Sequence, residues 1–309
     1  DFLVKLLDAL EIKQCHLCGV SFGGVVAMQV ALNYPDRVRS LVPMSTFAEM
    51  PGQLELFGSA FHMAITQAGF PLIQTLLLPL NMSSSWIERV RSTLPESMRR
   101  GYLYNDPYAI QNLMESYVSF QPFVHELARI QCPTLILNGE FDFLTPRLCH
   151  DTLRQNIRSS RLMIVPRAFH AFTLEYPELT VRIVEAFVRS VLEGKWQGDQ
   201  SVWVASEDPH SDVLATRCMG DHLRAVFVCP PDHQPKAEDQ WRDPLPGSEA
   251  AKSGRKSVGP AAAAPRKTAA EKKSPTAKPV VGKTAAPKTA AGKTAKTPAA
   301  KAAQSTRKG

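Results

Sequence analysis

The strongest constraint on this chain is the segment Gly19–Gly24, which reads Gly-Val-Ser-Phe-Gly-Gly. The run Cys15–Cys18 ahead of it suits a short buried strand, and Val25–Leu32 behind it suits a packed helix. Glycines allow a strained strand-to-helix turn and let the helix approach the sheet closely. The pattern G-x-S-x-G in this position predicts a nucleophile elbow, which lifts the Ser21 hydroxyl to the positive end of the helix dipole.

Two further polar residues follow apolar runs downstream. The run Pro133–Asn138 predicts a strand and continues into Gly-Glu-Phe-Asp, so Asp142 lies at a carboxyl strand end, where ligands gather in open α/β sheets. The run Arg161–Pro166 predicts another buried strand, and His170 follows it. Each residue alone could be a turn former or an unpaired loop residue, and Glu140 is a rival carboxylate. The chain order serine, aspartate, histidine, each after a strand, favours a catalytic triad.

The motifs in this order resemble the α/β-hydrolase superfamily over about residues 1–195. Tyr34–Val42 looks like the helix end and the following strand of that family. Asp142–Pro146 looks like its acid loop, and His170–Glu178 is similar to its histidine loop. The implied fold class is α/β: the C-terminal part of an α/β-hydrolase sheet with a helical lid, followed by a disordered tail.

The resemblance also implies roles for single residues. Ser21 would be the nucleophile, His170 the general base, and Asp142 the residue that orients the imidazole and stabilises the imidazolium. Phe22, as the residue after the nucleophile, would donate its backbone N–H to the oxyanion hole. Asp142 is preferred to Glu140 because it matches the position of the acid in the family's loop.

The start of the chain differs from the resembled fold. Residues 1–10 predict a helix with five apolar residues on one face, namely Phe2, Leu3, Leu6, Leu7 and Leu10. In the family such a helix precedes the nucleophile strand, so roughly 80–100 residues of earlier strands and helices would be missing. The missing part would carry the loop that supplies the second oxyanion N–H. We therefore expect the isolated 309-residue chain to be weakly active and prone to aggregation.

A helical lid is implied over about residues 46–130, between the strands near Val42 and Leu135. The first half of this stretch is rich in large apolar residues, namely Leu54, Leu56, Phe57, Phe61, Met63, Ile65, Phe70, Leu72, Ile73, Leu76, Leu77 and Leu78. Lid helices could simply bury these residues against one another. Alternatively, part of the apolar face could line a slot for a fatty acyl chain.

These features predict a serine hydrolase that acts on an ester or thioester with an apolar acyl group. The lid and the acid loop also resemble bacterial hydroxyacyl-carrier-protein transacylases and rhamnolipid-precursor acyl enzymes. The alternative activity is therefore hydroxyacyl transfer between carrier thioesters, although no H-x-x-x-x-D acyltransferase motif lies at a fitting place. A non-catalytic hydrolase-like protein is a third interpretation. We expect no cofactor and no metal.

The remaining segments contribute little apolar surface. Residues 196–249 predict a small accessory or linker segment, in which Ser201–Ala205 and His222–Val228 could pair as two strands across a loop.

Residues 250–309 are rich in Lys, Ala, Pro and Thr, and resemble linker-histone tails. With 15 Lys and Arg from residue 251 onward and Glu271 as the one acid, this tail has a net charge of about +14. It should be disordered and bind DNA, RNA or other polyanions without sequence preference, or merely improve solubility.

Two predictions concern the surroundings of the protein. No run of 18 apolar residues occurs, so no membrane span is expected. The six cysteines show no disulfide-scaffold spacing, and we interpret Cys15 and Cys18 as reduced thiols in a strand of the core. This pattern favours a cytoplasmic location, with association to the nucleoid if the tail binds DNA.

Overall fold

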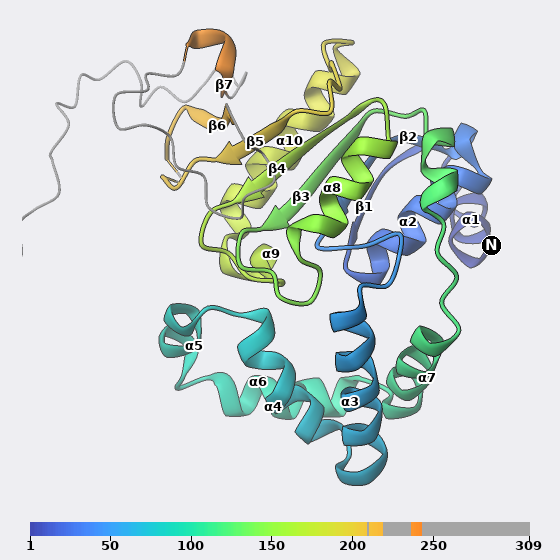
Figure 1. Ribbon diagram of the computed structural model, residues 1–309, viewed down its shortest axis with the longest axis vertical. Coiled ribbons are helices and arrows are strands. Elements are labelled where there is room, and N and C mark those ends of the chain that lie inside the picture. The colour runs from blue at the N-terminus through green and yellow to red at the C-terminus, as the bar shows by residue number, and fades with distance from the viewer. Residues whose placement is uncertain (209, 219–235, 243–309) are drawn as a thin grey trace, which may run out of the picture. The chain divides into compact units, whose positions relative to one another are not determined.

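The computed structural model describes residues 1–208, 210–218 and 236–242. All of them lie in one compact unit, residues 1–254. The described residues form an α/β structure with one sheet of seven strands, which follow one another across the sheet in chain order (Figure 1). No helix in this described part is both long and apolar enough to cross a bilayer.

The sheet is mixed. Its strands are β1 (Cys15–Val20), β2 (Val38–Met44), β3 (Thr134–Gly139), β4 (Ser160–Val165), β5 (Val202–Ala205), β6 (Val213–Arg217) and β7 (Gln240–Arg242). Strands β1 to β5 pair in parallel, whereas β6 pairs antiparallel with both β5 and β7. Because β1 to β4 run in parallel, their carboxyl ends meet at one edge of the sheet, where the candidate site lies.

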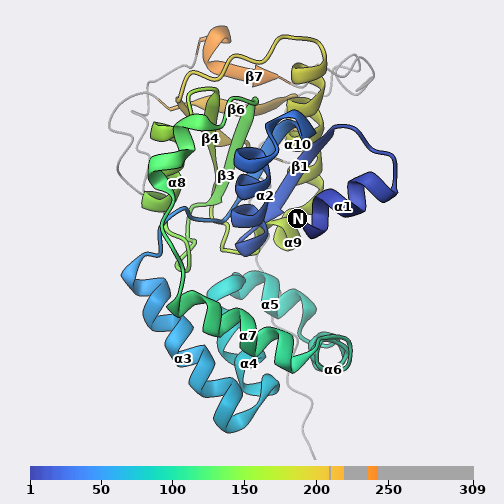
Figure 2. The same ribbon diagram turned by 90° about the vertical axis from the view of Figure 1, so that its right-hand side faces the viewer.

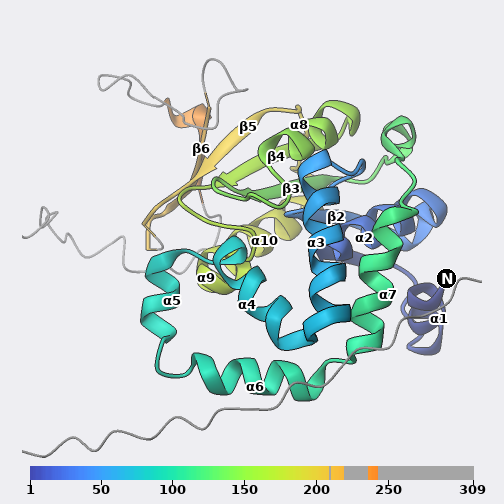
Figure 3. The same ribbon diagram turned by 60° about the horizontal axis from the view of Figure 1, so that its bottom comes forward.

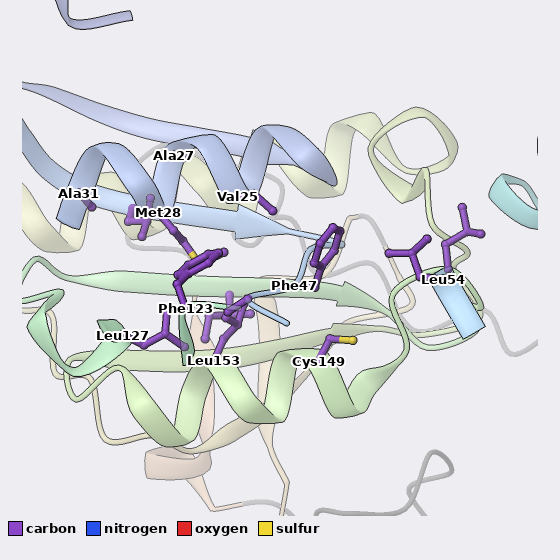
Figure 4. Close-up of a cluster of buried hydrophobic side chains, with 14 of the residues drawn as sticks. Val25, Ala27, Met28, Ala31, Phe47, Leu54, Phe123, Leu127, Cys149 and Leu153 are labelled. Carbon is purple, nitrogen blue, oxygen red and sulfur yellow. The ribbon is translucent and has the colours of Figure 1, made fainter. Parts of the chain in front are cut away.

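Helices cover both faces of the sheet. The flanking elements are α1 (Phe2–Ala9), α2 (Phe22–Asn33), η1 (Pro35–Arg37), η2 (Val124–Arg129), α8 (Arg147–Asn156), α9 (Phe172–Glu175), α10 (Pro177–Leu192) and η3 (Ala237–Asp239). Alternate residues of each central strand point to opposite faces. In β3, Ile136 joins the core beneath α2 and α8, while Leu135 and Leu137 join the core beneath α10. Figure 4 shows side chains of α2 and α8 in the first of these cores, with Phe123 and Leu127 among them.

Five helices, which we call the lid, are inserted between β2 and β3. They are α3 (Gly52–Ala68), α4 (Phe70–Asn81), α5 (Ser84–Val90), α6 (Leu94–Tyr104) and α7 (Pro107–Val118). Figure 2 shows these helices grouped together, apart from the helices that cover the sheet, and Figure 3 shows α3 beside α7 within the group. Five of the apolar lid residues are buried, namely Leu54, Phe61, Ile65, Phe70 and Ile73, whereas Leu56, Met63, Leu72 and Leu76 are exposed. Mutual burial therefore accounts for only part of the apolar lid.

The apolar face of α1 is only partly covered. Val4 and Leu7 are buried, whereas Phe2, Leu6 and Leu10, which directly follows the helix, are exposed. No described strand lies beyond β1, which pairs with β2 alone. For the same reason the thiols of this strand are not core residues: Cys15 is half-buried and Cys18 is exposed.

The segment after α10 continues the sheet. Ser201–Ala205 forms a strand largely as expected, β5, but its antiparallel partner is β6, in the stretch expected to be a loop. Strand β6 is short, and it is stabilised by pairing with β5 and β7 rather than by a long apolar pattern of its own. His222–Val228 and the tail 250–309 lie outside the described residues.

Candidate active site

The predicted elbow forms where β1 ends and α2 begins. Ser21 has φ +54° and ψ −124°, a conformation that non-glycine residues rarely adopt. Its N–H donates to Met44 O at 2.8 Å, and its carbonyl accepts from Gly24 N at 2.8 Å. A Cβ atom on Gly19 would lie 2.2 Å from Gly23 O, so only glycine fits this close approach. Gly19 is therefore required by the turn, whereas a Cβ atom on Gly23, the second glycine of the motif, would meet nothing within 4 Å.

Asp142 and His170 form a buried pair. His170 Nδ1 lies 2.9 Å from Asp142 Oδ1 and 3.0 Å from Oδ2, and only 4% of Asp142 is exposed. The carboxylate also accepts hydrogen bonds from Leu144 N, Thr145 N and Thr145 Oγ1. Burial raises the pKa of Asp142, but the charge and hydrogen bond of His170 and the Thr145 hydrogen bond outweigh it and hold the pKa below its ordinary value. An ionised Asp142 fixes the proton on Nδ1 and leaves Nε2 as the basic nitrogen.

The rival carboxylate has a different partner. Glu140 Oε2 accepts a hydrogen bond from the backbone N–H of Arg167 at 2.8 Å. This contact holds the start of the loop that leads to His170, but no hydrogen bond joins Glu140 to the imidazole in the described part of the chain. The His170 ring therefore contacts Asp142 and not Glu140.

The turn after β2 links the elbow to the histidine loop. Ser45 Oγ donates to His170 O at 2.8 Å, and Thr46 Oγ1 donates to Ser21 O at 2.7 Å. Sequence reasoning overlooked both hydroxyls. They could have been noticed as two adjacent polar residues directly after an apolar strand, at the carboxyl edge where the triad candidates also lie.

A second histidine supports this turn from α8. His150 is fully buried, and its Nε2 accepts the backbone N–H of Thr46 at 2.9 Å. Burial lowers the pKa of His150 to about 4, even though the Asp142 carboxylate opposes this shift. At neutral pH the ring is uncharged and serves as a hydrogen-bond acceptor. Sequence reasoning gave no role to this residue.

Ser21 and His170 are both hydrogen-bonded to the turn after β2, Ser21 through Thr46 and His170 through Ser45. Among the described residues, no hydrogen bond joins Ser21 Oγ to the His170 ring; catalytic contacts of this kind are often long without substrate. None of the hydrogen bonds in this part of the chain uses the Phe22 N–H, the first amide of α2. The Phe22 ring lies 6.1 Å from that of Tyr117 in α7, so the lid reaches the residue after the serine.

The described residues contain no cluster of three or more His, Cys, Asp or Glu side chains suited to a metal ion.

Comparison with known proteins adds to this geometry. A family model described as "Serine aminopeptidase, S33" (Hydrolase_4) matches residues 1–177. The chain is 29% identical over 192 residues to the serine hydrolase BPHL of Mus musculus, covering 60% of this chain and 58% of that protein. It is 28% identical over 196 residues to the pimeloyl-[acyl-carrier protein] methyl ester esterase of Aeromonas hydrophila, covering 60% of this chain and 75% of that protein. The chain thus spans less than two thirds of the length of the mouse relative.

Solved structures share the fold. The enol-lactonase from Burkholderia xenovorans LB400 superimposes with a TM-score of 0.55 at 20% identity, covering 60% of this chain and 70% of that one. A thermophilic esterase from Thermogutta terrifontis superimposes with a TM-score of 0.54 at 24% identity, covering 61% and 70%. At these identities the likeness concerns the fold alone.

Proposed function

Because the chain belongs to the serine aminopeptidase S33 family of α/β-fold hydrolases, we propose that it hydrolyses an ester or thioester through an acyl-enzyme on Ser21. The observation that carries this proposal is the buried Asp142–His170 pair, tied through Ser45 to the same turn that holds the Ser21 elbow. A buried carboxylate that orients an imidazole next to a strained serine is the arrangement that serine hydrolases need.

The chemistry follows from these positions. Ser21 Oγ attacks the acyl carbonyl carbon while His170 Nε2 takes the hydroxyl proton, and the carbonyl oxygen becomes an oxyanion. The free N–H of Phe22, at the start of α2, donates to that oxyanion. His170 then protonates the departing alcohol or thiol as the bond to the acyl carbon breaks. Water, deprotonated by the same nitrogen, releases the acid and restores Ser21. Asp142 stays ionised throughout.

An apolar acyl group is the best-supported substrate feature. Tyr117 contacts the ring of Phe22, so an acyl group on Ser21 would lie beside the lid. Several lid residues near the main core are apolar and only partly buried, including Phe57, Leu77 and Leu80. Apolar walls with few polar groups suit an aliphatic chain.

Two other interpretations are less well supported. A hydroxyacyl transacylase would use the same acyl-enzyme and differ only in the acceptor, a second thiol in place of water. The esterase among the relatives, whose name specifies the methyl ester of pimeloyl-[acyl-carrier protein], favours water as the acceptor. A non-catalytic scaffold would have no need of an Asp142–His170 pair that is buried and hydrogen-bonded in this way.

Covalent labelling tests the nucleophile. We expect a fluorophosphonate probe to label a full-length version of the protein, and Ser21→Ala to abolish the label, because the elbow exposes an activated hydroxyl. His170→Ala should slow labelling about as strongly, since base and nucleophile act as one unit. The measurement is the rate of probe incorporation, with the labelled peptide identified by mass spectrometry. Labelling that persists in Ser21→Ala would refute the assignment.

A pair of isosteric changes tests the acid. Asp142→Asn should lower kcat on the order of 10⁴-fold, because an amide stabilises the wrong imidazole tautomer. Glu140→Gln is the matched control: it keeps an oxygen that can accept the Arg167 N–H and should change kcat little. Steady-state hydrolysis of a chromogenic ester measures both variants. If Glu140→Gln lost more activity than Asp142→Asn, the wrong carboxylate would have been chosen.

A further inference from the structure

One end of the lid is fastened to the segment that carries His170. We call residues 81–86, at the turn from α4 into α5, the lid junction, and residues 170–175 the histidine segment. The strongest contact between them is the hydrogen bond from Ser83 N–H to Glu175 Oε1 at 2.8 Å. Two further hydrogen bonds join the same segments, from Ala171 N to Asn81 O at 2.9 Å and from Trp86 Nε1 to Leu174 O at 3.3 Å.

Glu175 is unusual for a glutamate because it is only 7% exposed. Ser83 is the N-cap of α5, a helix of seven residues. In a capping box a glutamate within the helix accepts the N-cap N–H, but the third residue of α5 is Trp86, which cannot do so. Glu175 supplies the missing carboxylate from a segment 92 residues away in the chain. A negative charge also suits the positive end of a helix.

The lid junction is also hydrogen-bonded to the residue that follows the general base. Ala171 follows His170, and its N–H is held by Asn81 O, two residues before Ser83. If the lid junction came loose, the peptide after His170 would lose this partner. Ser45 would then be the remaining hydrogen-bond partner of the His170 backbone in the described part of the chain.

We propose that Glu175 is a positioning residue. It holds the lid junction on the histidine segment, so that the position of His170 relative to the lid stays fixed. This inference rests on the proposed function, because His170 is taken as the general base. Removing the carboxylate leaves the Ser83 N–H without its partner and lets both segments shift. Displacements of about 1 Å far from the chemistry can lower rates 10²-fold.

The test is carried out with a small acetate ester on a full-length version of the protein, which contains residues 1–309. Glu175→Ala should lower kcat about tenfold to a hundredfold with KM little changed, because substrate contacts stay in place while the base is misplaced. Glu175→Gln keeps an oxygen that can accept the Ser83 N–H and should restore most of kcat. Glu178→Ala is the matched control, since Glu178 is an exposed glutamate three residues further on, in the first turn of α10.

Changes at Ser83 test the contact from its other side. Ser83 has φ −68°, and Met82 before it is extended, so the backbone here accepts proline, which removes the N–H donor and the hydroxyl and places its Cδ where the Glu175 carboxylate accepts. Ser83→Ala removes the hydroxyl alone. In the Ser83→Ala background we expect Glu175→Ala to lower kcat by the same factor as in the wild type. In the Ser83→Pro background it should lower kcat by less than about threefold, because the hydrogen bond between residues 83 and 175 is already lost there.

The outcomes separate the two proposals. Three results would overturn the positioning role. The first is an equal loss of kcat in Glu175→Ala and Glu175→Gln, and the second is a loss in Glu175→Ala no larger than in Glu178→Ala. The third is full additivity of Glu175→Ala with Ser83→Pro. Should the wild type neither hydrolyse esters nor take up the fluorophosphonate, the proposed function itself fails. Amide hydrogen exchange of Ala171 then still tests the contact: it should accelerate in Glu175→Ala and not in Glu175→Gln, and unchanged exchange would overturn it.

Discussion

Backbone strain is concentrated at the carboxyl edge of the sheet. Five non-glycine residues among those described have positive φ, and three of them, Ser21, Ser45 and Arg167, follow directly or closely on β1, β2 and β4. Such conformations cost about 1–3 kcal/mol each and persist where the surroundings impose them. Here the surroundings are hydrogen bonds: Ser21 N to Met44 O, Ser45 N to Leu137 O, and Arg167 N to Glu140. One of these three residues, Ser21, is the proposed nucleophile, and the other two lie in the turns that follow β2 and β4.

His150 predicts a pH dependence of stability. Its folded pKa is lowered to about 4, whereas an unfolded histidine titrates near 6.5. Between these values the unfolded chain binds more protons at this site, so the free energy of unfolding should fall as pH decreases from about 6.5 to 4. The loss should level off below pH 4 and amount to on the order of 3 kcal/mol.

Urea denaturation at several pH values between 4 and 7 measures this effect. His150→Gln removes the titrating group while keeping an acceptor for the Thr46 N–H, so its stability should depend less steeply on pH in this window. His125→Gln, at an exposed histidine in η2, serves as the control and should retain the wild-type slope. An unchanged slope in His150→Gln would contradict the assignment.

At the scale of elements, the sheet is asymmetric. Strands β2 to β4 are covered on both faces and paired on both sides, whereas β1 is paired only with β2 among the described strands. The second side of β1 thus presents unpaired N–H and C=O groups next to the exposed side chains of Cys18 and Val20. An open apolar strand edge is a template for pairing with another chain. Strand β1, which ends directly before Ser21, is therefore an edge open to association.

The lid is joined to the core in more than one place. Its first helix follows β2, its last packs on Phe22 through Tyr117, and the lid junction is bound to the histidine segment. Motion of the whole lid as one rigid body would break the contacts at Glu175. Opening at α6, which is charged and mostly exposed, would leave them intact.

At the scale of the whole molecule, the composition of the basic tail predicts that DNA binding can be removed without affecting ester hydrolysis. Deleting residues 250–309 should leave ester hydrolysis and the melting temperature unchanged, because this segment has scarcely any large apolar side chains with which to pack on a core. The deletion should abolish retention on DNA at low salt. The intact chain should lose that retention steeply between roughly 50 and 200 mM salt, as phosphate contacts do.

Gel-shift assays with unrelated DNA sequences and thermal melting measure the two effects. A solubilising tail without a partner would give no retention at any salt concentration. Loss of hydrolysis on truncation would show that the tail contributes to the folded part of the molecule.

The sequence by itself determined the strands β1 to β5 and the candidate residues Ser21, Asp142 and His170. It could do so because strand periodicity and the glycines of a tight turn are properties of short, contiguous segments. Only the tertiary structure decided which carboxylate contacts the imidazole and that His150 and Glu175 bind backbone amides of distant segments. Those contacts join residues 28 to 104 positions apart, and a local pattern carries no information about them.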